Sequence, residues 1–530
     1  MMSDIDASIP PPSSDRFDAI VIGAGHNGLV AANYLARAGL SVALFEARDT
    51  VGGCSSSESM GDVTVNICNC DHITFRTTPI LEELELASHG LRYLDVEPSQ
   101  LNLDWDGGPA WAICHSVDTT LELLSQTFPS QVDGYRRYVD DALPVARLVL
   151  AAAAAGPQRS RLLTTAARAR GRGIRRLLQW SRLSAEQVFR TYFSDERVYA
   201  PALATGPVVW GLSPRLPGTG LGALTYALRH AATVGRPVGG SGSLAVALQS
   251  AFLARSGSLF TSASVASIVL ESDKVAGVRL ADGRVFRSSR VVSAADPGRT
   301  FLEWLQNPPS GAGPTIDRWR AYQPTQGYES KIDAVIDAVP EYRQVDRDLF
   351  ARVGLDPMVA SAMIVPTVQE MHEAFELMPT GRVAERPVFF ANVPTVLDPT
   401  MAPPGRHVFS LETLFTPYNH PGGWAASSEP RRWLDRYSTL LSNDILSSLG
   451  PWRAMTPDRY ESEFHMPKGH ATSFAGGPLA ALRGRPQELT RYRTPVEGLY
   501  LCGAATFPGA GIWGASGRHC ADEVLRHSKA

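Results

Sequence analysis

The stretch from Phe17 to Glu46, FDAIVIGAGHNGLVAANYLARAGLSVALFE, decides how the chain begins to fold. An apolar run leads into Gly23, Gly25 and Gly28, apolar residues at helical spacing follow, and a second apolar run ends the stretch. Gly23 allows a tight turn, Gly25 lets a pyrophosphate approach the backbone, and Gly28 lets the helix pack against the strand. The stretch therefore predicts a βαβ unit that binds a dinucleotide at the N-terminus of its helix.

The residues after the helix narrow the type of dinucleotide. Glu46 ends the second strand, where a carboxylate accepts hydrogen bonds from a ribose and disfavours a 2′-phosphate. Arg48 and the pair Gly52-Gly53 come next. A basic group and flexible backbone at this place can meet the phosphates or the ribityl chain of a longer cofactor such as FAD. The alternative for these three residues is a glycine turn beside a solvated arginine.

The composition limits the class of protein. A chain of 530 residues fits two or three domains. Its 50 basic and 53 acidic residues nearly cancel, so no overall charge points to nucleic acid. Six cysteines are scattered along the chain without a C-x-x-C pair, which predicts neither a disulfide framework nor a metal site. We interpret them as the reduced thiols of a cytoplasmic protein.

Two segments bear on mobility and on membranes. Residues 1–15 are polar and proline-rich and lack the features of a signal peptide, which predicts a mobile tail. No run of about 18 apolar residues is present that could span a bilayer. The region of about 157–183 combines eight arginines with several leucines. Such helices can contact an anionic membrane surface peripherally, and the alternative is a solvated surface helix.

A series of short strands follows in the middle of the chain. The segments between 265 and 293 are strand-like, and Asp282-Gly283 is a strong hairpin signal. We expect these strands to return to the first domain. One then adds to the parallel sheet, and the others form a small antiparallel patch on it.

The later pattern predicts a second domain. Residues 329–337, 389–393 and 407–415 look like strands, and 433–449 looks like an amphipathic helix. The fold class is therefore α/β, with a discontinuous Rossmann-like FAD-binding domain plus an α+β substrate domain that has an antiparallel sheet and helical insertions. We place the FAD-binding domain at residues 16–80, 235–300 and 480–530, and the substrate domain at 81–234 and 301–479.

The end of the chain carries another glycine-rich motif. Residues 498–503 read as an apolar strand stopped by Gly503, and Pro508, Gly509, Gly511 and Gly514 precede a final helix. Backbone N–H groups in such a turn can face the flavin pyrimidine or the ribityl chain and stabilise negative charge there. The alternative is a plain terminal helix.

Three motifs together carry a family resemblance: DAIVIGAGHNGLVAA at 18–32, VGG at 51–53 and YRTPVEGLYLCG at 492–503. They resemble the phytoene desaturase-like FAD-dependent oxidoreductases, and within them the branch of pyridine nucleotide-disulfide oxidoreductase domain-containing protein 2. The resemblance covers nearly the whole chain and implies non-covalently bound FAD. By position it assigns FAD contacts to Gly23, Gly25, Gly28, Glu46, Arg48, Gly53, Val265, Gly503 and the region of Ile512, and the glycine patterns add Gly52 and Gly511.

Segments 66–72 and 506–513 depart from the family pattern, and both are expected on the substrate side of the flavin. They supply the candidates for the substrate pocket, namely Asn69, Cys70, Phe507 and Trp513. The resemblance implies hydride transfer from a small apolar organic substrate to flavin N5, with loss of a neighbouring proton to form a double bond. Asp71 and His72 are the candidate proton acceptors, and the alternative for them is a hydrogen-bonded structural role.

Other functions stay open at this stage. An amine or alcohol oxidase, a non-redox isomerase that uses reduced FAD, and a non-catalytic binding protein are all compatible with the cofactor motifs. The electron acceptor is unknown, with oxygen and a quinone as candidates. No second complete nucleotide motif is present, so tight binding of NAD(P) is not expected.

Overall fold

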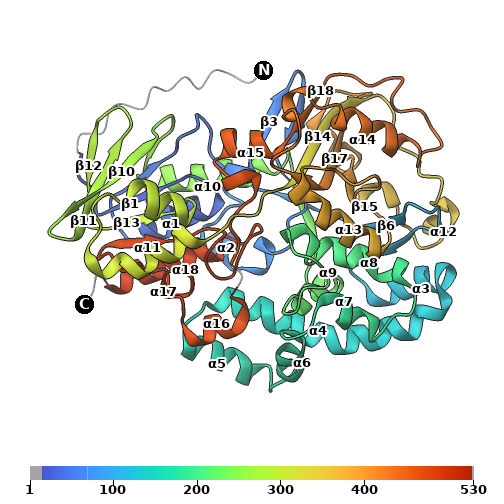
Figure 1. Ribbon diagram of the computed structural model, residues 1–530, viewed down its shortest axis with the longest axis horizontal. Helices are drawn as coiled ribbons and strands as arrows, with labels where there is room; N and C mark the ends of the chain where they lie inside the picture. Colours follow the sequence, from blue (N-terminus) through green and yellow to red (C-terminus); the bar gives the residue numbers. More distant parts are fainter. Residues whose placement is uncertain (1–14, 69, 475, 528–530) are drawn as a thin grey trace.

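The computed structural model describes residues 15–68, 70–474 and 476–527 and has two halves built on separate sheets (Figure 1). The predicted tail lies outside the described residues, apart from Asp15, and so does the pocket candidate Asn69. One half contains a parallel sheet covered on both faces, and the other contains a larger, mainly antiparallel sheet. This architecture confirms the predicted fold class.

Five parallel strands form the sheet of the first half, in the order β19-β13-β1-β2-β9. Their bounds are β1 Ala19–Ile22, β2 Val42–Phe45, β9 Ser258–Phe260, β13 Val291–Ser293 and β19 Leu499–Leu501. Every residue of β1 and β2 is buried, as expected for strands of a doubly covered parallel sheet. The strands come from the three segments predicted to share one domain, and the residue boundaries of both domains stay a prediction.

The two faces of this sheet are covered differently. Helices α1 (His26–Arg37), α10 (Gly242–Ala254) and α18 (Ala515–His527) pack on one face. On the other face lie α11 (Gly313–Ala321) and an antiparallel sheet of β10 (Val265–Glu271), β11 (Lys274–Leu280) and β12 (Val285–Arg287). The antiparallel patch and the joining of β13 to the parallel sheet are confirmed. Strand β9 was not predicted, because its three residues are too few to show an alternation of apolar and polar side chains.

A seven-stranded sheet forms the second half, in the order β18-β14-β17-β16-β15-β6-β7. All neighbours pair antiparallel except β15 and β6, which are parallel. Its strands are β6 Gln100–Asp104, β7 Trp111–Ile113, β14 Gly327–Ile336, β15 Ala362–Val365, β16 Phe389–Asn392, β17 His407–Pro417 and β18 Trp452–Met455.

Helices α12 (Arg347–Arg352) and α14 (Glu429–Ser438) pack against the apolar outer face of this sheet. The inner face is divided. Its β6-β7 end packs against a helical region (Figure 1) that comprises α3 Val117–Thr127, α4 Val132–Ala155, α5 Arg159–Arg168, α6 Ile174–Trp180, α7 Ala185–Arg190, α8 Glu196–Thr205 and α9 Thr225–Ala231. Its β14-β17 end faces a hairpin of β3 (Ser57–Met60) and β4 (Val63–Asn66) and helix α15 (Pro457–Phe464).

The remaining elements connect these layers. They are α2 Ile80–Glu83, β5 Tyr93–Asp95, which pairs with β8 Gly235–Pro237, α13 Val368–Leu377, α16 Gly477–Arg483 and α17 Gln487–Thr490. Helix α16 contacts α5 of the basic region.

The predicted helix over 433–449 is wrong in its extent, because α14 covers Glu429–Ser438. Beyond it the backbone bonds to another segment: Ser442 N donates to Glu341 O at 2.7 Å, and the Asn443 side chain accepts from Glu341 N at 2.9 Å. These tertiary hydrogen bonds replace the bonds that a longer helix would make.

The close approach of α1 to β1 predicts a large effect for Gly28→Ala. A Cβ at Gly28 would lie 1.9 Å from the carbonyl oxygen of Gly23, whereas a Cβ at Gly25 would meet nothing within 4 Å. We expect Gly28→Ala to destabilise the FAD-free protein by about 1–3 kcal/mol, as overpacking does. Gly25→Ala should leave its thermal unfolding unchanged. Equal unfolding temperatures of wild type and Gly28→Ala would contradict the packing described.

Candidate functional site

A cavity of about 230 Å³ lies at the carboxyl ends of β1, β2 and β13. Both halves of the protein contribute to it, since the parallel strands supply one wall and residues 464–472 supply another. The lining includes Gly23, Gly25, Glu46, Arg48, Gly53, Val265, Ala294, Asp296, Arg299, Phe464, His465 and Met466. Ligands of open α/β sheets bind at this edge.

The glycine loop has the conformation that its sequence predicts. Gly23 has φ +94°, a value that L-residues rarely adopt, and it leads directly from β1 into the loop. Gly25 precedes α1, and no side chain caps the first turn of this helix. The N–H groups of the first turn therefore have no capping side chain as an acceptor and can donate hydrogen bonds to an anion.

The Glu46 side chain connects this loop to the end of β2 through hydrogen bonds. Its Oε2 accepts a hydrogen bond from Ala24 N at 2.8 Å, and its Oε1 accepts one from Arg48 N at 3.0 Å. Gly52 N donates to Ala24 O at 2.8 Å and ties the second glycine pair to the same loop. The carboxylate lines the cavity while two backbone groups fix its orientation.

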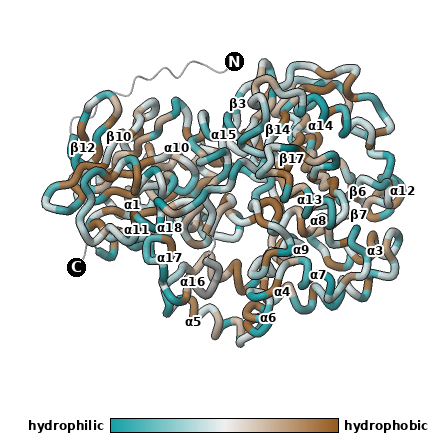
Figure 2. Tube along the Cα trace, viewed as in Figure 1, coloured by the Kyte–Doolittle hydropathy of each residue, from teal (hydrophilic) through white to brown (hydrophobic). Residues whose placement is uncertain are grey.

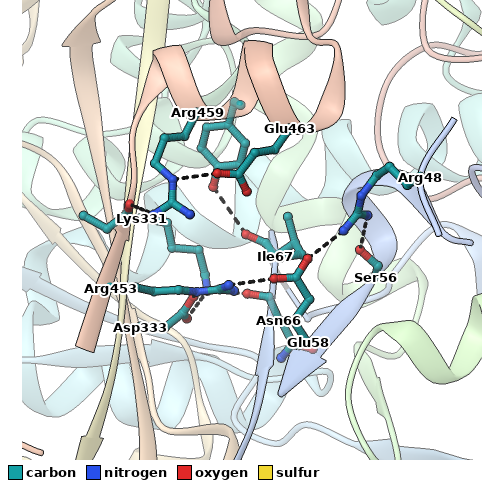
Figure 3. Close-up of polar contacts among 12 residues, drawn as sticks. Arg48, Ser56, Glu58, Asn66, Ile67, Lys331, Asp333, Arg453, Arg459 and Glu463 are labelled. Carbon is teal, nitrogen blue, oxygen red and sulfur yellow. Dashed lines mark hydrogen bonds and ion pairs between the residues drawn. The ribbon is translucent and has the colours of Figure 1, made fainter. Parts of the chain in front are cut away.

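The Arg48 guanidinium is already paired. It contacts Glu58 Oε1 at 2.6 Å and Ser56 Oγ at 3.3 Å (Figure 3). It also lies over the ring of Phe464, 4.3 Å from the ring centroid. Arg48 lines the cavity, as the sequence predicts for a cofactor contact, but its charge is shared with Glu58.

The structure separates the predicted FAD residues into three groups. Gly23, Gly25, Glu46, Arg48, Gly53 and Val265 line the cavity. Gly28 and Gly52 lie behind it and allow close packing. Gly503 N donates to Ser516 Oγ at 2.9 Å, and its neighbours Ala504 and Ala505 line the cavity.

Gly511 and Ile512 do not line this cavity, and Gly511 lies beside aromatic side chains that we call the aromatic wall. A Cβ at Gly511 would lie 3.6 Å from Nε1 of Trp513 and 3.7 Å from Trp210, and the Ile512 carbonyl accepts from Thr74 Oγ1 at 2.6 Å. The pocket candidate Phe507 stacks edge-on against Phe474, with ring centroids 6.1 Å apart. Trp513 and Phe507, both predicted pocket residues, therefore stand among other aromatic side chains.

Sequence reasoning missed several lining residues. Asp296 and Arg299 follow β13, and Asp296 Oδ2 accepts from Thr472 Oγ1 at 2.6 Å, across from the other half. A sequence signal for Asp296 was present, because the segment Ala294-Ala295-Asp296-Pro297 follows a predicted parallel strand at its carboxyl end, where ligands bind. Phe464, His465 and Met466 carried no local motif.

Asp71 is a buried and paired carboxylate outside the cavity lining. It contacts Arg236 Nε at 2.6 Å and accepts from Ser361 Oγ at 2.6 Å. Burial alone would raise its pKa, but the Arg236 charge and these hydrogen bonds bring the pKa below the ordinary value. A carboxylate whose pKa lies below the ordinary value is a weak proton acceptor.

His72 is likewise occupied. Its Nδ1 lies 2.9 Å from Tyr93 Oη and its Nε2 lies 2.7 Å from Ser241 Oγ. Burial lowers the pKa of His72 to about 3, so the ring is neutral at physiological pH. Cys70, the neighbouring pocket candidate, is buried with its Sγ 3.9 Å from Asn392 Oδ1.

A second and larger cavity, of about 940 Å³, lies in the helical region among Arg137, Glu186, Arg190, Tyr192 and Arg215. It contains no residue of the glycine loop and none of the predicted site residues. The smaller cavity is therefore the candidate cofactor site.

The residues of the smaller cavity fit a flavin dinucleotide. A Cβ at Gly25 would project into open space rather than into protein, which leaves room for a phosphate at the uncapped start of α1. Glu46 presents a carboxylate beside that position, as a ribose requires. The cavity also extends past Val265 to residues of the second half.

Comparisons with known proteins agree with this fit. The model of the family of flavin-containing amine oxidoreductases matches residues 28–323. A mouse relative, pyridine nucleotide-disulfide oxidoreductase domain-containing protein 2, is 30% identical over 97% of this chain and 94% of its own. Phytoene desaturase (neurosporene-forming) of Cereibacter sphaeroides is 25% identical over 96% and 94%. The crystal structure of an oxidoreductase from Methanosarcina mazei superposes with a TM-score of 0.61 at 17% identity, covering 97% and 100%.

Replacing Glu46 should weaken the binding of FAD. Glu46→Gln removes one of two acceptors and the charge, and hydrogen bonds to charged groups contribute about 1.5–3 kcal/mol. We therefore expect FAD to dissociate about 10- to 100-fold more readily, as measured by flavin fluorescence on titration of the FAD-free protein. Glu376→Gln, at an exposed carboxylate, is the control. An unchanged dissociation constant in Glu46→Gln would contradict this assignment.

Proposed function

Since the chain belongs to the family of flavin-containing amine oxidoreductases and is an FAD-dependent oxidoreductase, we propose that it dehydrogenates an organic substrate with a largely apolar body. The observation that carries this proposal is the position of the cavity. It joins the glycine loop and Glu46 of one half to residues 464–472 of the other. The aromatic wall around Gly511 stands beside the predicted flavin turn at the end of the chain.

The chain's own residues have defined parts in this proposal. The start of α1 and Gly25 would hold the pyrophosphate, Glu46 the ribose, and Val265 with Ala504 and Ala505 would line the remainder. When bound, FAD supplies a two-electron acceptor for a hydride from a substrate C–H bond. Trp210, Trp513 and Phe507 would exclude water from the apolar part of the substrate.

We assign structural rather than acid–base roles to Asp71 and His72. Both lie among buried partners, and the described neighbours of His72 occupy both of its ring nitrogens. Removing one member of a buried ion pair such as Asp71 and Arg236 costs about 3–5 kcal/mol. These residues would hold the segment 66–72 against β8 and β15.

The proposal predicts an anaerobic loss of flavin absorbance. We expect a substrate of the right class to bleach the yellow FAD-loaded protein and to yield a product lighter by two hydrogen atoms. A panel of apolar hydrocarbons, amines and alcohols, read by absorbance and by product mass, separates a desaturase from an amine or alcohol oxidase. A product of unchanged mass that forms only after prior reduction of the flavin would instead show an isomerase. Purified protein that takes up no flavin would contradict the proposal.

We also propose that the basic region of α5 and α6 contacts an anionic membrane surface. Hydrophobic and hydrophilic stretches alternate along these helices (Figure 2), and Leu163 and Leu178 are 54% and 40% exposed beside the arginines. In the described part of the chain no helix has the length and hydrophobicity needed to cross a bilayer.

Flotation with liposomes tests the membrane proposal. We expect the protein to float with anionic vesicles at low salt and to remain behind with neutral ones, because the attraction is electrostatic. A variant with Arg168, Arg170, Arg172 and Arg175 changed to glutamine should lose flotation while keeping its FAD. Equal flotation of this variant and the wild type would contradict the membrane proposal.

A further inference from the structure

Two cysteines meet at the open end of the hairpin of β3 and β4. The antiparallel pairing of the hairpin continues past its strands, because Ile67 N donates to Ser56 O at 3.1 Å. Cys68 is the next residue on one side, and Cys54 lies just before Ser56 on the other side, in the short helix Gly53–Ser55. The hairpin therefore brings together two thiols that are separated along the chain by both of its strands.

The two thiols are in direct contact. The Cys68 thiol donates a hydrogen bond to Cys54, and the Cys54 thiol in turn donates to Sδ of Met466 at a Sγ–Sδ distance of 3.3 Å. Met466 follows α15 and packs in the same apolar cluster as Cys68. Both cysteines are half-buried, so a small solute can reach them.

The pair lies at the edge of the cofactor cavity. Gly53, which precedes Cys54, lines the cavity from one half of the protein, and Met466 lines it from the other. A Cβ at Gly53 would lie 3.5 Å from Cα of Gly25 in the glycine loop. Neither cysteine is among the described lining residues, but both neighbours of the Cys54 sulfur along this wall are. Chemistry at Cys54 thus takes place directly behind the cavity wall.

The surroundings give the two thiols different roles. The hydrogen bond to Cys54, burial, and the charges of Cys54, Glu329 and Glu412 raise the pKa of Cys68 above its ordinary value. Cys68 therefore keeps its proton at neutral pH, and attack on an oxidant falls to Cys54. Cys68 is then in place as the second thiol, in contact with the sulfur that reacts first.

The other cysteines lack this combination of contact and access. All four are buried, namely Cys70, Cys114, Cys502 and Cys520. Among them Cys502 and Cys520 share a hydrogen bond, as Cys54 and Cys68 do, but they are only 1% and 0% exposed. We call Cys502 and Cys520 the buried thiol pair. It provides an internal control, because it has the contact without the access.

We propose that Cys54 and Cys68 are a hydroperoxide-reactive dithiol that closes into a reversible disulfide beside the cofactor cavity. The Cys54 sulfur attacks one oxygen of the hydroperoxide and forms an S–O bond while the O–O bond breaks. The other oxygen leaves as an alcohol, or as water from hydrogen peroxide, with the proton of Cys54. The Cys68 sulfur then attacks the sulfenic acid on Cys54, which forms the S–S bond and releases water with the proton of Cys68.

This site goes beyond the proposed function, because it needs no organic substrate of the flavin. Two thiols are oxidised to one disulfide, and one hydroperoxide is reduced by the same two electrons. A dithiol reagent such as dithiothreitol returns both cysteines to thiols by exchange.

Hydrogen peroxide added to the FAD-loaded, full-length protein tests the proposal. We expect a small excess to remove two of the six thiols and dithiothreitol to restore them. After the remaining thiols are alkylated, proteolysis at Glu58 separates the two cysteines, so mass spectrometry should find their peptides joined by an S–S bond. The link should form at least about tenfold faster than one in the buried thiol pair, because oxidation follows exposure.

Substitutions assign the two roles. Cys68→Ser should leave Cys54 as a sulfenic acid that dimedone labels once per chain, whereas Cys54→Ser should abolish both the label and the link. Cys520→Ser, in the buried thiol pair, should change neither. Flavin content and thermal unfolding show whether each variant is folded, and the linked peptide of the wild type tests the proposal without any variant.

Several results would overturn the proposal. They are six thiols retained in excess peroxide, a link between Cys68 and Cys70, a link in the buried thiol pair that forms equally fast, and a dimedone label on Cys68. Formation of the link in anaerobic protein without peroxide would also overturn it, since the flavin would then be the oxidant.

Discussion

The ion-pair chain from Arg48 through Glu58 and Arg453 to Asp333 and Lys331 joins the two halves of the molecule. One end lies in the cofactor cavity, and the other lies in the buried sheet that faces it. The pair of Arg453 and Glu58 is only partly buried, with side chains 18% and 29% exposed, and it acts together with the buried pair of Lys331 and Asp333 to hold the halves in one arrangement. The position of the cavity between them depends on this connection.

The same ion pairs determine the electrostatics of the inner face of the seven-stranded sheet at its β14-β17 end. Lys331 and Arg453 pair with Asp333, and Arg236 pairs with Asp71. Glu329 and Glu412 therefore form no ion pair with these cations.

Local sequence was sufficient for the glycine loop of the cofactor half. Gly23, Gly25 and Gly28 have steric requirements that a short motif displays, and Glu46 and Val265 line the cavity as expected. The partners of Asp71 and His72 were not visible, because Arg236, Tyr93 and Ser241 come from distant parts of the chain. Glu329 was hidden for another reason. The alternation Glu-Ser-Lys-Ile-Asp in β14 looks the same whether its polar face meets solvent or is covered by another segment of the protein.

Burial raises the pKa of Glu329 to about 7 and, together with the charge of Glu329, raises the pKa of Glu412 to about 8, so the pair retains a proton at neutral pH. Infrared difference spectroscopy across a pH titration tests it directly, because a protonated carboxyl group has its own C=O stretch. The account predicts a carboxyl band that disappears with a midpoint between about pH 7 and 8 and that is altered in Glu412→Gln. Complete ionisation of both groups at pH 6, with no such band, would contradict it.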